Sequence, residues 1–267
     1  MPVMSRNLDV WLGKKQILHS VAFEANAGEV TMIIGPNGSG KTTLLRSLTG
    51  DIPHEGDITI NGNPIRRANK AELARMRAVL AQHTLLSFPF TVAEVVEMGL
   101  RAGEDATLDA TMRSDHINAA LQQVDLAGFA DRLCQELSGG EQQRVHLARV
   151  LCQIRNPKAE GSAKWLFLDE PVASLDIRHQ LQVMEIVQGF ARRGGGVIAV
   201  MHDMNLAAMF GDRIVAMSSG KVVKSGSPET VLTSETLSDV FDCPLRVGVV
   251  PKGRQFVLPQ SAAHGGE

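Results

Sequence analysis

The sequence predicts an α/β fold in which a largely parallel sheet is preceded by an antiparallel β region and carries an inserted helical subdomain. Three observations predict this fold. Apolar runs at 30–34, 165–168 and 197–201 end at Gly35, Asp169 and His202, as buried parallel strands do. Apolar residues alternate over much of the first 60 positions, which is typical of half-buried strands. Between about 91 and 155 they recur with a helical period.

The elements follow in order along the chain. Alternating segments and turn residues predict antiparallel strands at 8–12, 17–25 and 57–60, with turns at 13–14 and 61–62. Helical faces are expected over 92–100, 117–124 and 147–154. A polar connector, a hairpin, and a turn followed by a helix are expected at 155–164, after 219–220, and at 228–241.

These elements predict one domain, 1–267, built in parts. Residues 1–84 and 158–258 are expected to form the core, and residues 85–157 the helical subdomain. A tail, 259–267, is expected to be disordered.

Composition and the lengths of the apolar runs limit the partners and the location that we expect. The 267 residues are 44% hydrophobic and 21% charged, with a formal net charge of −2, so no nucleic-acid partner is expected. No apolar run approaches the ~20 residues that cross a bilayer, and the N-terminus has no apolar signal-like core. We therefore expect a cytosolic protein that reaches a membrane only by docking.

The clearest motif follows the first buried strand. It fits the P-loop pattern and comprises Gly35, Pro36, Asn37, Gly38, Ser39, Gly40, Lys41 and Thr42. Glycines let backbone N–H groups surround phosphates, and the N-terminus of the following helix adds positive charge. Lys41 is expected to reach the outer phosphates of ATP, Thr42 to bind Mg²⁺, and Thr43 to contact an inner phosphate.

A second buried strand ends in the paired carboxylates Asp169 and Glu170. One acid suits a Mg²⁺ ligand, directly or through water, and the next suits a general base for the attacking water. Because parallel strands bring their carboxyl ends to one edge, we expect this pair to lie beside the P-loop and His202.

The segment Ser138, Gly139, Gly140 and Glu141 precedes a helical pattern. It can be read as a helix cap, with serine capping and glutamate in the first turn, or as a second phosphate-facing helix terminus. With the P-loop before it and the Asp-Glu strand after it, the chain closely resembles the ATP-binding-cassette (ABC) ATPases over nearly its whole length. That family has a P-loop NTPase (RecA-like) core.

The resemblance implies further site residues. Gln82 matches the Q-loop glutamine, which touches Mg²⁺ or water and faces the membrane partner. Asp176, in Ser-Leu-Asp, matches the D-loop, although the residues before it depart from the commoner Thr-Ser-Ala. His202 matches the switch histidine at the γ-phosphate. Trp11 is expected to stack on adenine, with Val10 as the alternative.

The resemblance also implies partners. Family members work as head-to-tail homodimers that hold ATP between the P-loop of one copy and the Ser-Gly-Gly-Glu segment of the other. Importers of the family dock on transmembrane permease subunits at the cytoplasmic face of the inner membrane, and a periplasmic binding protein delivers their cargo. A non-transport ABC ATPase is the alternative, although the coiled coils, zinc sites or duplicated cassettes of such proteins are not evident in the sequence.

The region that precedes the helical insert indicates the branch. Residues 77–82, 88–92 and 94–99 resemble the iron-chelate and vitamin B12 importers, and the runs 87–90 and 164–168 are most similar to members that serve heme uptake. Heme is therefore the expected cargo, with a ferric siderophore or cobalamin as the alternative.

Overall fold

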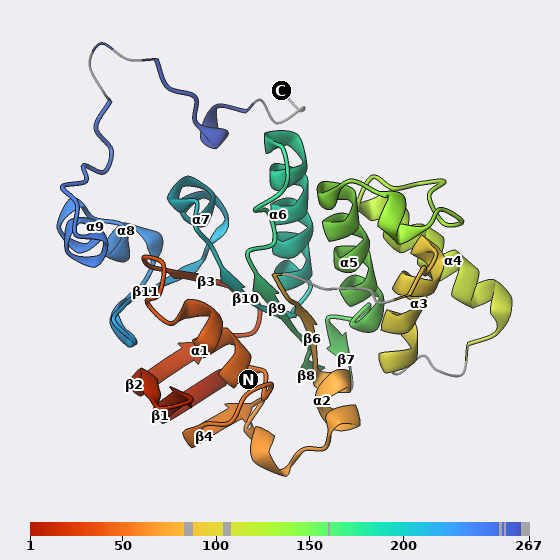
Figure 1. Ribbon diagram of the computed structural model, residues 1–267, viewed down its shortest axis with the longest axis horizontal. Coiled ribbons are helices and arrows are strands. Elements are labelled where there is room, and N and C mark those ends of the chain that lie inside the picture. Colours follow the sequence, from red (N-terminus) through yellow and green to blue (C-terminus); the bar gives the residue numbers. More distant parts are fainter. Residues whose placement is uncertain (83–87, 104–107, 160, 251–252, 254, 263–267) are drawn as a thin grey trace.

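The computed structural model describes residues 1–82, 88–103, 108–159, 161–250, 253 and 255–262. Among these residues the central feature is a six-stranded sheet (Figure 1). Five strands are parallel and the edge strand β12 is antiparallel. The spatial order is β12 (Lys221–Gly226), β11 (Arg213–Ser218), β3 (Val30–Ile34), β10 (Gly196–Val200), β9 (Trp165–Asp169) and β6 (Arg77–Leu80). The three continuously apolar runs form β3, β9 and β10, which lie side by side at the centre.

The predicted antiparallel region is confirmed. It is a separate four-stranded sheet in the order β2 (Lys15–Ala25), β1 (Val3–Leu12), β4 (Glu55–Ile60) and β5 (Asn63–Pro64). The expected turns at 13–14 and 61–62 connect β1 to β2 and β4 to β5. Alternate residues of β1 are buried, since only one face of this sheet packs on the core.

The central sheet is covered on both faces, as Figure 1 shows. On one face, Ile33 and Phe167 pack with Leu44 of α1 (Lys41–Leu48) and with the antiparallel sheet. On the other face, Met32 and Leu168 pack toward α5, α6 (Ile177–Arg192) and α7 (Met204–Phe210). Burial on both faces is the reason these strands are apolar at nearly every position, with Thr31 and Asp169 as the exceptions.

The helical insert is also confirmed. It contains α3 (Val92–Ala102), α4 (Ala110–Gln123) and α5 (Gly139–Gln153), of which α3 and α4 lie beside α5 and away from the central sheet (Figure 1). Side chains of Thr91, Asp109 and Ser138 cap the three helices, so each begins where its sequence supplies an acceptor for free N–H groups.

Smaller elements complete the chain and correct two expectations. They are α2 (Lys70–Met76), β7 (Lys158–Ala159), β8 (Ser162–Ala163), α8 (Pro228–Val231) and α9 (Ser234–Phe241). The connector 155–164 was expected to be irregular, but it contains the β7–β8 hairpin. The tail was expected to be disordered from 259, but Pro259–Ser261 forms a 3₁₀ turn in which Pro259 is buried, beside α7. Residues 263–267 and Ser87 lie outside the described residues.

Candidate functional site

The P-loop is shaped by glycines with positive φ angles, two of which also lie too close to neighbouring atoms to carry a side chain. Gly35 leaves β3 at φ +150°, and a Cβ there would lie 2.2 Å from the carbonyl oxygen of Met217. Gly38 has φ +78° and faces open space, whereas Gly40 is the N-cap of α1 at φ +100°. Within the described residues no side chain caps α1, and its first turn carries no acidic residue. Its N-terminal N–H groups are therefore available to an external anion.

Two side chains of the P-loop fit a phosphate. The Nζ atom of Lys41 donates to the carbonyl oxygens of Gly35 and Pro36 at 2.8 and 3.0 Å, directly over the loop. Burial lowers the pKa of Lys41, and the nearby carboxylates of Glu170 and Asp169 oppose that shift. The hydroxyl of Ser39 is buried and has no hydrogen-bond partner among the described residues. A phosphate would satisfy both groups.

A pair of hard oxygen ligands lies at the end of the P-loop. The hydroxyl of Thr42 donates to Oδ1 of Asp169 at 3.0 Å. Burial raises the pKa of Asp169, and the hydrogen bond from Thr42 acts in the opposite direction. Hydroxyl and carboxylate oxygens, completed by water and phosphate oxygens, are the donors that Mg²⁺ prefers. These residues therefore fit the metal that the sequence predicts.

The structure brings Gln82, Glu170 and His202 together. Nε2 of Gln82 donates to Oε2 of Glu170 at 2.8 Å, and Nε2 of His202 lies 2.5 Å from the other carboxylate oxygen. Glu170 has a left-handed backbone, with φ +52°, which turns the chain sharply as it leaves β9. The carboxylate is thus held from both sides beside the Thr42–Asp169 pair.

Sequence reasoning missed one neighbour of Glu170. Nε2 of Gln143, on α5, donates to the carbonyl oxygen of Glu170 at 3.0 Å. This bond holds the left-handed turn after β9 and connects it to the helix that begins at Gly139. The only signal in the sequence is that Gln143 lies one turn along the helix from Gly139 and Gly140.

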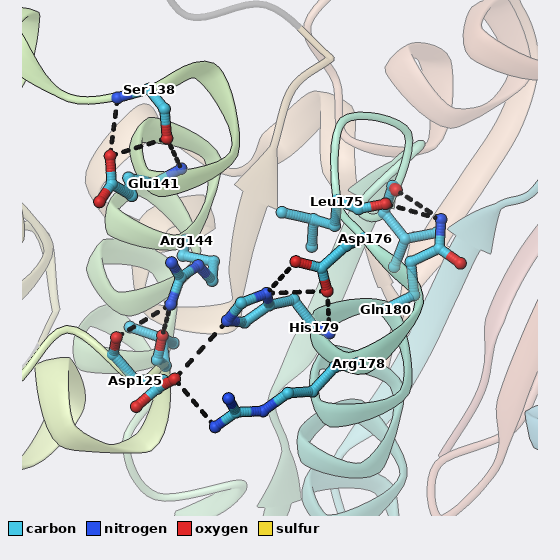
Figure 2. Close-up of polar contacts among 11 residues, drawn as sticks. Asp125, Ser138, Glu141, Arg144, Leu175, Asp176, Arg178, His179 and Gln180 are labelled. Carbon is cyan, nitrogen blue, oxygen red and sulfur yellow. Dashed lines mark hydrogen bonds and ion pairs between the residues drawn. The ribbon is translucent and has the colours of Figure 1, made fainter. Parts of the chain in front are cut away.

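Both readings of the Ser138–Glu141 segment apply to one structure. Ser138 and Glu141 form a capping box at the start of α5, drawn in Figure 2. The N–H and hydroxyl of Ser138 donate to Glu141 Oε2 at 2.8 and 2.7 Å, and these bonds lower the pKa of Glu141. A Cβ on Gly139 would meet no atom within 4 Å, so this end of the helix is open.

The open end of α5 lies near Glu170 of the same chain. Gly139, Gln82 and Glu170 line one cavity of about 260 Å³, together with Ser174 of the D-loop. None of residues 35–42 lines that cavity. The P-loop and Gly139 therefore do not share this cavity.

The remaining residues of the predicted site are Asp176, the alternatives Val10 and Trp11, and Thr43. Asp176 caps α6 and binds His179, and its side chain is largely exposed. Val10 is completely buried against Leu18, so it has no surface to offer a base. Trp11 is 42% exposed at the end of β1, and of the two alternatives it is the one available for stacking. Thr43 lies in the first turn of α1.

No helix in the described part of the chain is long and apolar enough to cross a membrane. Among the same residues no cluster of three or more His, Cys, Asp or Glu side chains could hold a metal ion.

Known proteins resemble this chain in sequence and in structure. The family model described as ABC transporter matches residues 18–173. The hemin import ATP-binding protein HmuV of Mesorhizobium japonicum is 52% identical over 266 residues, 98% of this chain and 100% of the relative. That of Rhizobium meliloti is 51% identical over 262 residues, 97% of this chain and 99% of the relative.

Solved structures give the same result. A dimeric ATP-binding cassette bound to ADP and Pi in a post-hydrolysis state superposes with a TM-score of 0.75 at 26% identity, over 85% of this chain and 98% of that one. A nucleotide-free ATP-binding cassette from an ABC transporter gives 0.73 at 24% identity, over 91% and 96%. The chain therefore belongs to the ABC transporter family, as one of its ATP-hydrolysing cassettes.

Proposed function

We propose that this chain is the ATP-hydrolysing subunit of an importer that moves hemin across the inner membrane. One observation carries the hydrolytic part: Glu170 is held between Gln82 and His202 beside the Thr42–Asp169 pair. Full-length similarity to hemin import ATP-binding proteins supports the cargo.

The residues divide the work of hydrolysis. The N-terminus of α1 and Lys41 bind the phosphates, with Thr43 at an inner phosphate. Thr42 and Asp169 would hold Mg²⁺, with Gln82 as a further ligand directly or through water. Mg²⁺ neutralises charge on the phosphate oxygens when it is bound.

Three further residues complete the chemistry. A carboxylate oxygen of Glu170 accepts a proton from the attacking water. His202 orients that carboxylate through its 2.5 Å contact and lies where it can donate to the γ-phosphate. Trp11 offers its exposed ring to adenine.

The site is completed by a second copy. Because the Ser138–Glu141 segment does not line the same cavity as its own P-loop, we infer that it serves the P-loop of a partner, head to tail. ATP then lies between the two copies, with Gly139, Gly140 and Asp176 at the contact. Binding joins the copies and hydrolysis releases them.

The same arrangement suggests how transport is driven. Residues 1–84 and 158–258 act as the catalytic core, and 85–157 as the helical subdomain that carries the Ser138–Glu141 segment. The homodimer lies at the cytoplasmic face of the membrane against transmembrane permease subunits, and a periplasmic binding protein supplies the cargo. The exposed ring of Phe88 suits contact with the permease.

Glu170→Gln tests the chemistry. The amide cannot accept the proton, so we expect hydrolysis of Mg-ATP to fall by roughly 100-fold or more while binding persists, leaving a trapped dimer. Turnover at the wild-type rate would remove Glu170 from the role of base.

Ser138→Arg tests the pairing. The bulky cation fills the open end of α5, so ATP-driven dimerisation of the Glu170→Gln protein should be lost in size-exclusion chromatography while each chain still binds nucleotide. Unchanged dimerisation would contradict the head-to-tail arrangement.

The cargo is tested with the assembled importer in vesicles. ATP-dependent uptake of heme, a ferric siderophore and cobalamin is compared, with Glu170→Gln as the inactive control. Uptake of heme supports the proposal, and uptake of another cargo in its place refutes the assignment of hemin while leaving the ATPase role intact.

A further inference from the structure

The C-terminal end of α4 is a junction between three helices. The last carbonyl groups of a helix have no partner within it and need other donors. Here Nε2 of Gln182, on α6, donates to the carbonyl of Gln123 at 3.0 Å. The guanidinium of Arg144, on α5, donates to the carbonyls of Val124 and Asp125 at 2.8 and 2.9 Å. The end of α4 is therefore fixed to α5 and α6 together.

The side chain of Asp125 extends this junction toward the D-loop. Figure 2 shows the ring of His179 between two carboxylates, Asp125 after α4 and Asp176 at the start of α6. Nδ1 of His179 lies 2.9 Å from Oδ2 of Asp176, and Nε2 lies 3.6 Å from Oδ2 of Asp125. The His179 side chain is 17% exposed, so solvent screens these contacts less than it would on the open surface.

The D-loop packs directly on the helix that begins at Gly139. The carbonyl oxygen of Ser174 would lie 3.1 Å from a Cβ on Gly140. At the other side of the loop, Nε2 of Gln180 donates to the carbonyl of Leu175 at 3.0 Å. A shift of α4 and α5 relative to α6 would thus change the surroundings of the D-loop.

We propose that His179 is a positioning residue that fixes the D-loop carboxylate of Asp176 relative to α5, by bridging Asp176 to Asp125. The bridge connects the D-loop to the helical subdomain, since the position of Asp125 follows that of α5 through the hydrogen bond from Arg144. With both carboxylates in place the D-loop is aligned for hydrolysis, and without Asp125 the carboxylate of Asp176 keeps only its contacts within α6 among the described residues. The inference rests on the proposed ATPase function and assigns no new chemistry to it.

Substitutions by asparagine at position 179 and by glycine at position 125 test the two halves of the bridge separately. Asn at position 179 retains a donor close to the place of Nδ1 but is too short to reach Asp125. Gly at position 125 removes the carboxylate and suits the left-handed backbone there, with φ +56°. The control is Arg178→Ala, which removes the 3.3 Å contact of an exposed guanidinium with the same carboxylate.

The experiment measures kcat and KM for Mg-ATP with the full chain. We expect His179→Asn and Asp125→Gly each to lower kcat roughly fivefold with KM changed less than about twofold, and the double variant to fall no further. Arg178→Ala should stay within about 1.5-fold of the wild type. A double variant that loses no more kcat than either single variant indicates a shared bridge, because independent structural effects on kcat would add.

Three results would overturn the proposal. They are unchanged kcat in both single variants, additive losses in the double variant, and a loss as large in Arg178→Ala. Thermal unfolding of each variant verifies folding, and if His179→Asn does not fold, Asp125→Gly against Arg178→Ala decides alone. Failure of the wild type to hydrolyse ATP would instead refute the proposed function, so the two failures are distinct.

Discussion

The N-termini of α1 and α5 look alike in sequence but differ in structure. Each follows glycines, and each is expected to face phosphate. Among the described residues no side chain caps α1, whereas α5 is capped by Ser138 and holds the carboxylate of Glu141 on that serine. The first terminus is therefore ready for an external anion, and the second already binds an internal one. In the proposed head-to-tail dimer, a phosphate held by the partner must share Ser138 with Glu141 or displace it, so the two termini would be unequal halves of a site.

The two helices also bury different bases. Lys41, at the start of α1, is partly desolvated but faces Asp169 and Glu170, whose charges favour its protonated form. His146, on α5, is buried beside Arg149, and these two influences lower the pKa of His146 to about 4. Buried Lys41 is thus a cation stabilised by neighbouring carboxylates. Buried His146, in the helix that carries the Ser138–Glu141 segment, is a neutral ring.

The largest expected effect concerns the glycine that opens the P-loop. Gly35→Ala places a Cβ 2.2 Å from the Met217 carbonyl oxygen, so backbone must move. We expect the free energy of unfolding to fall by roughly 3 kcal/mol and nucleotide binding to be lost. Thermal unfolding and nucleotide titration measure both. The matched control is Gly38→Ala, where the new methyl meets open space and the cost is about 1 kcal/mol of backbone strain. Equal losses in the two variants would contradict this account.

The next effect is a pH dependence of stability. Above pH 6.5 His146 is neutral in the folded and unfolded states alike. Between pH 6.5 and about 4 the unfolded chain takes up a proton that the folded chain does not, so the free energy of unfolding falls as pH falls. This loss should reach roughly 2–3 kcal/mol near pH 4.5, measured by denaturant unfolding. His146→Gln should flatten the curve, and parallel curves would exclude His146 as the cause.

A smaller effect separates the serines of the two termini. Ser138→Ala removes the cap of α5 and should cost about 1 kcal/mol of stability. Ser39→Ala removes a buried hydroxyl without a partner among the described residues, and we expect little change or a slight gain. Denaturant unfolding of both variants provides the comparison. A larger loss at Ser39 than at Ser138 would show that α1 has an internal cap.

The smallest effect tests the internal anion. Glu141→Gln keeps a side chain that completes a capping box but removes its negative charge. ATP-driven dimerisation of the Glu170→Gln protein should then strengthen roughly threefold, because phosphate no longer meets a carboxylate at Ser138. Analytical ultracentrifugation across a range of ATP concentrations measures the change. Weaker pairing would mean that the Glu141 carboxylate itself is needed at the contact.

Most of the fold and site could be predicted from the sequence because the signals are local. A strand buried on both faces must be apolar throughout, and a phosphate loop needs glycines, Lys41 and Thr42 in fixed order. The antiparallel region and the helical insert are each indicated by the spacing at which apolar residues recur. The connector 155–164 and the tail after 258 gave only polar or weak signals, so their hairpin and 3₁₀ turn could not be predicted.

By itself the sequence predicted which side chains would carry the chemistry, since Lys41, Asp169 and Glu170 follow apolar runs whose parallel pairing brings their ends to one edge. Only the tertiary structure decided which side chains hold them. Gln143 reaches Glu170 across 27 positions, and His179 meets Asp125 across 54 positions, counted from 125 to 179. Such contacts depend on how α4, α5 and α6 pack. The packing of these helices is set by the whole core, so a local sequence pattern cannot predict it.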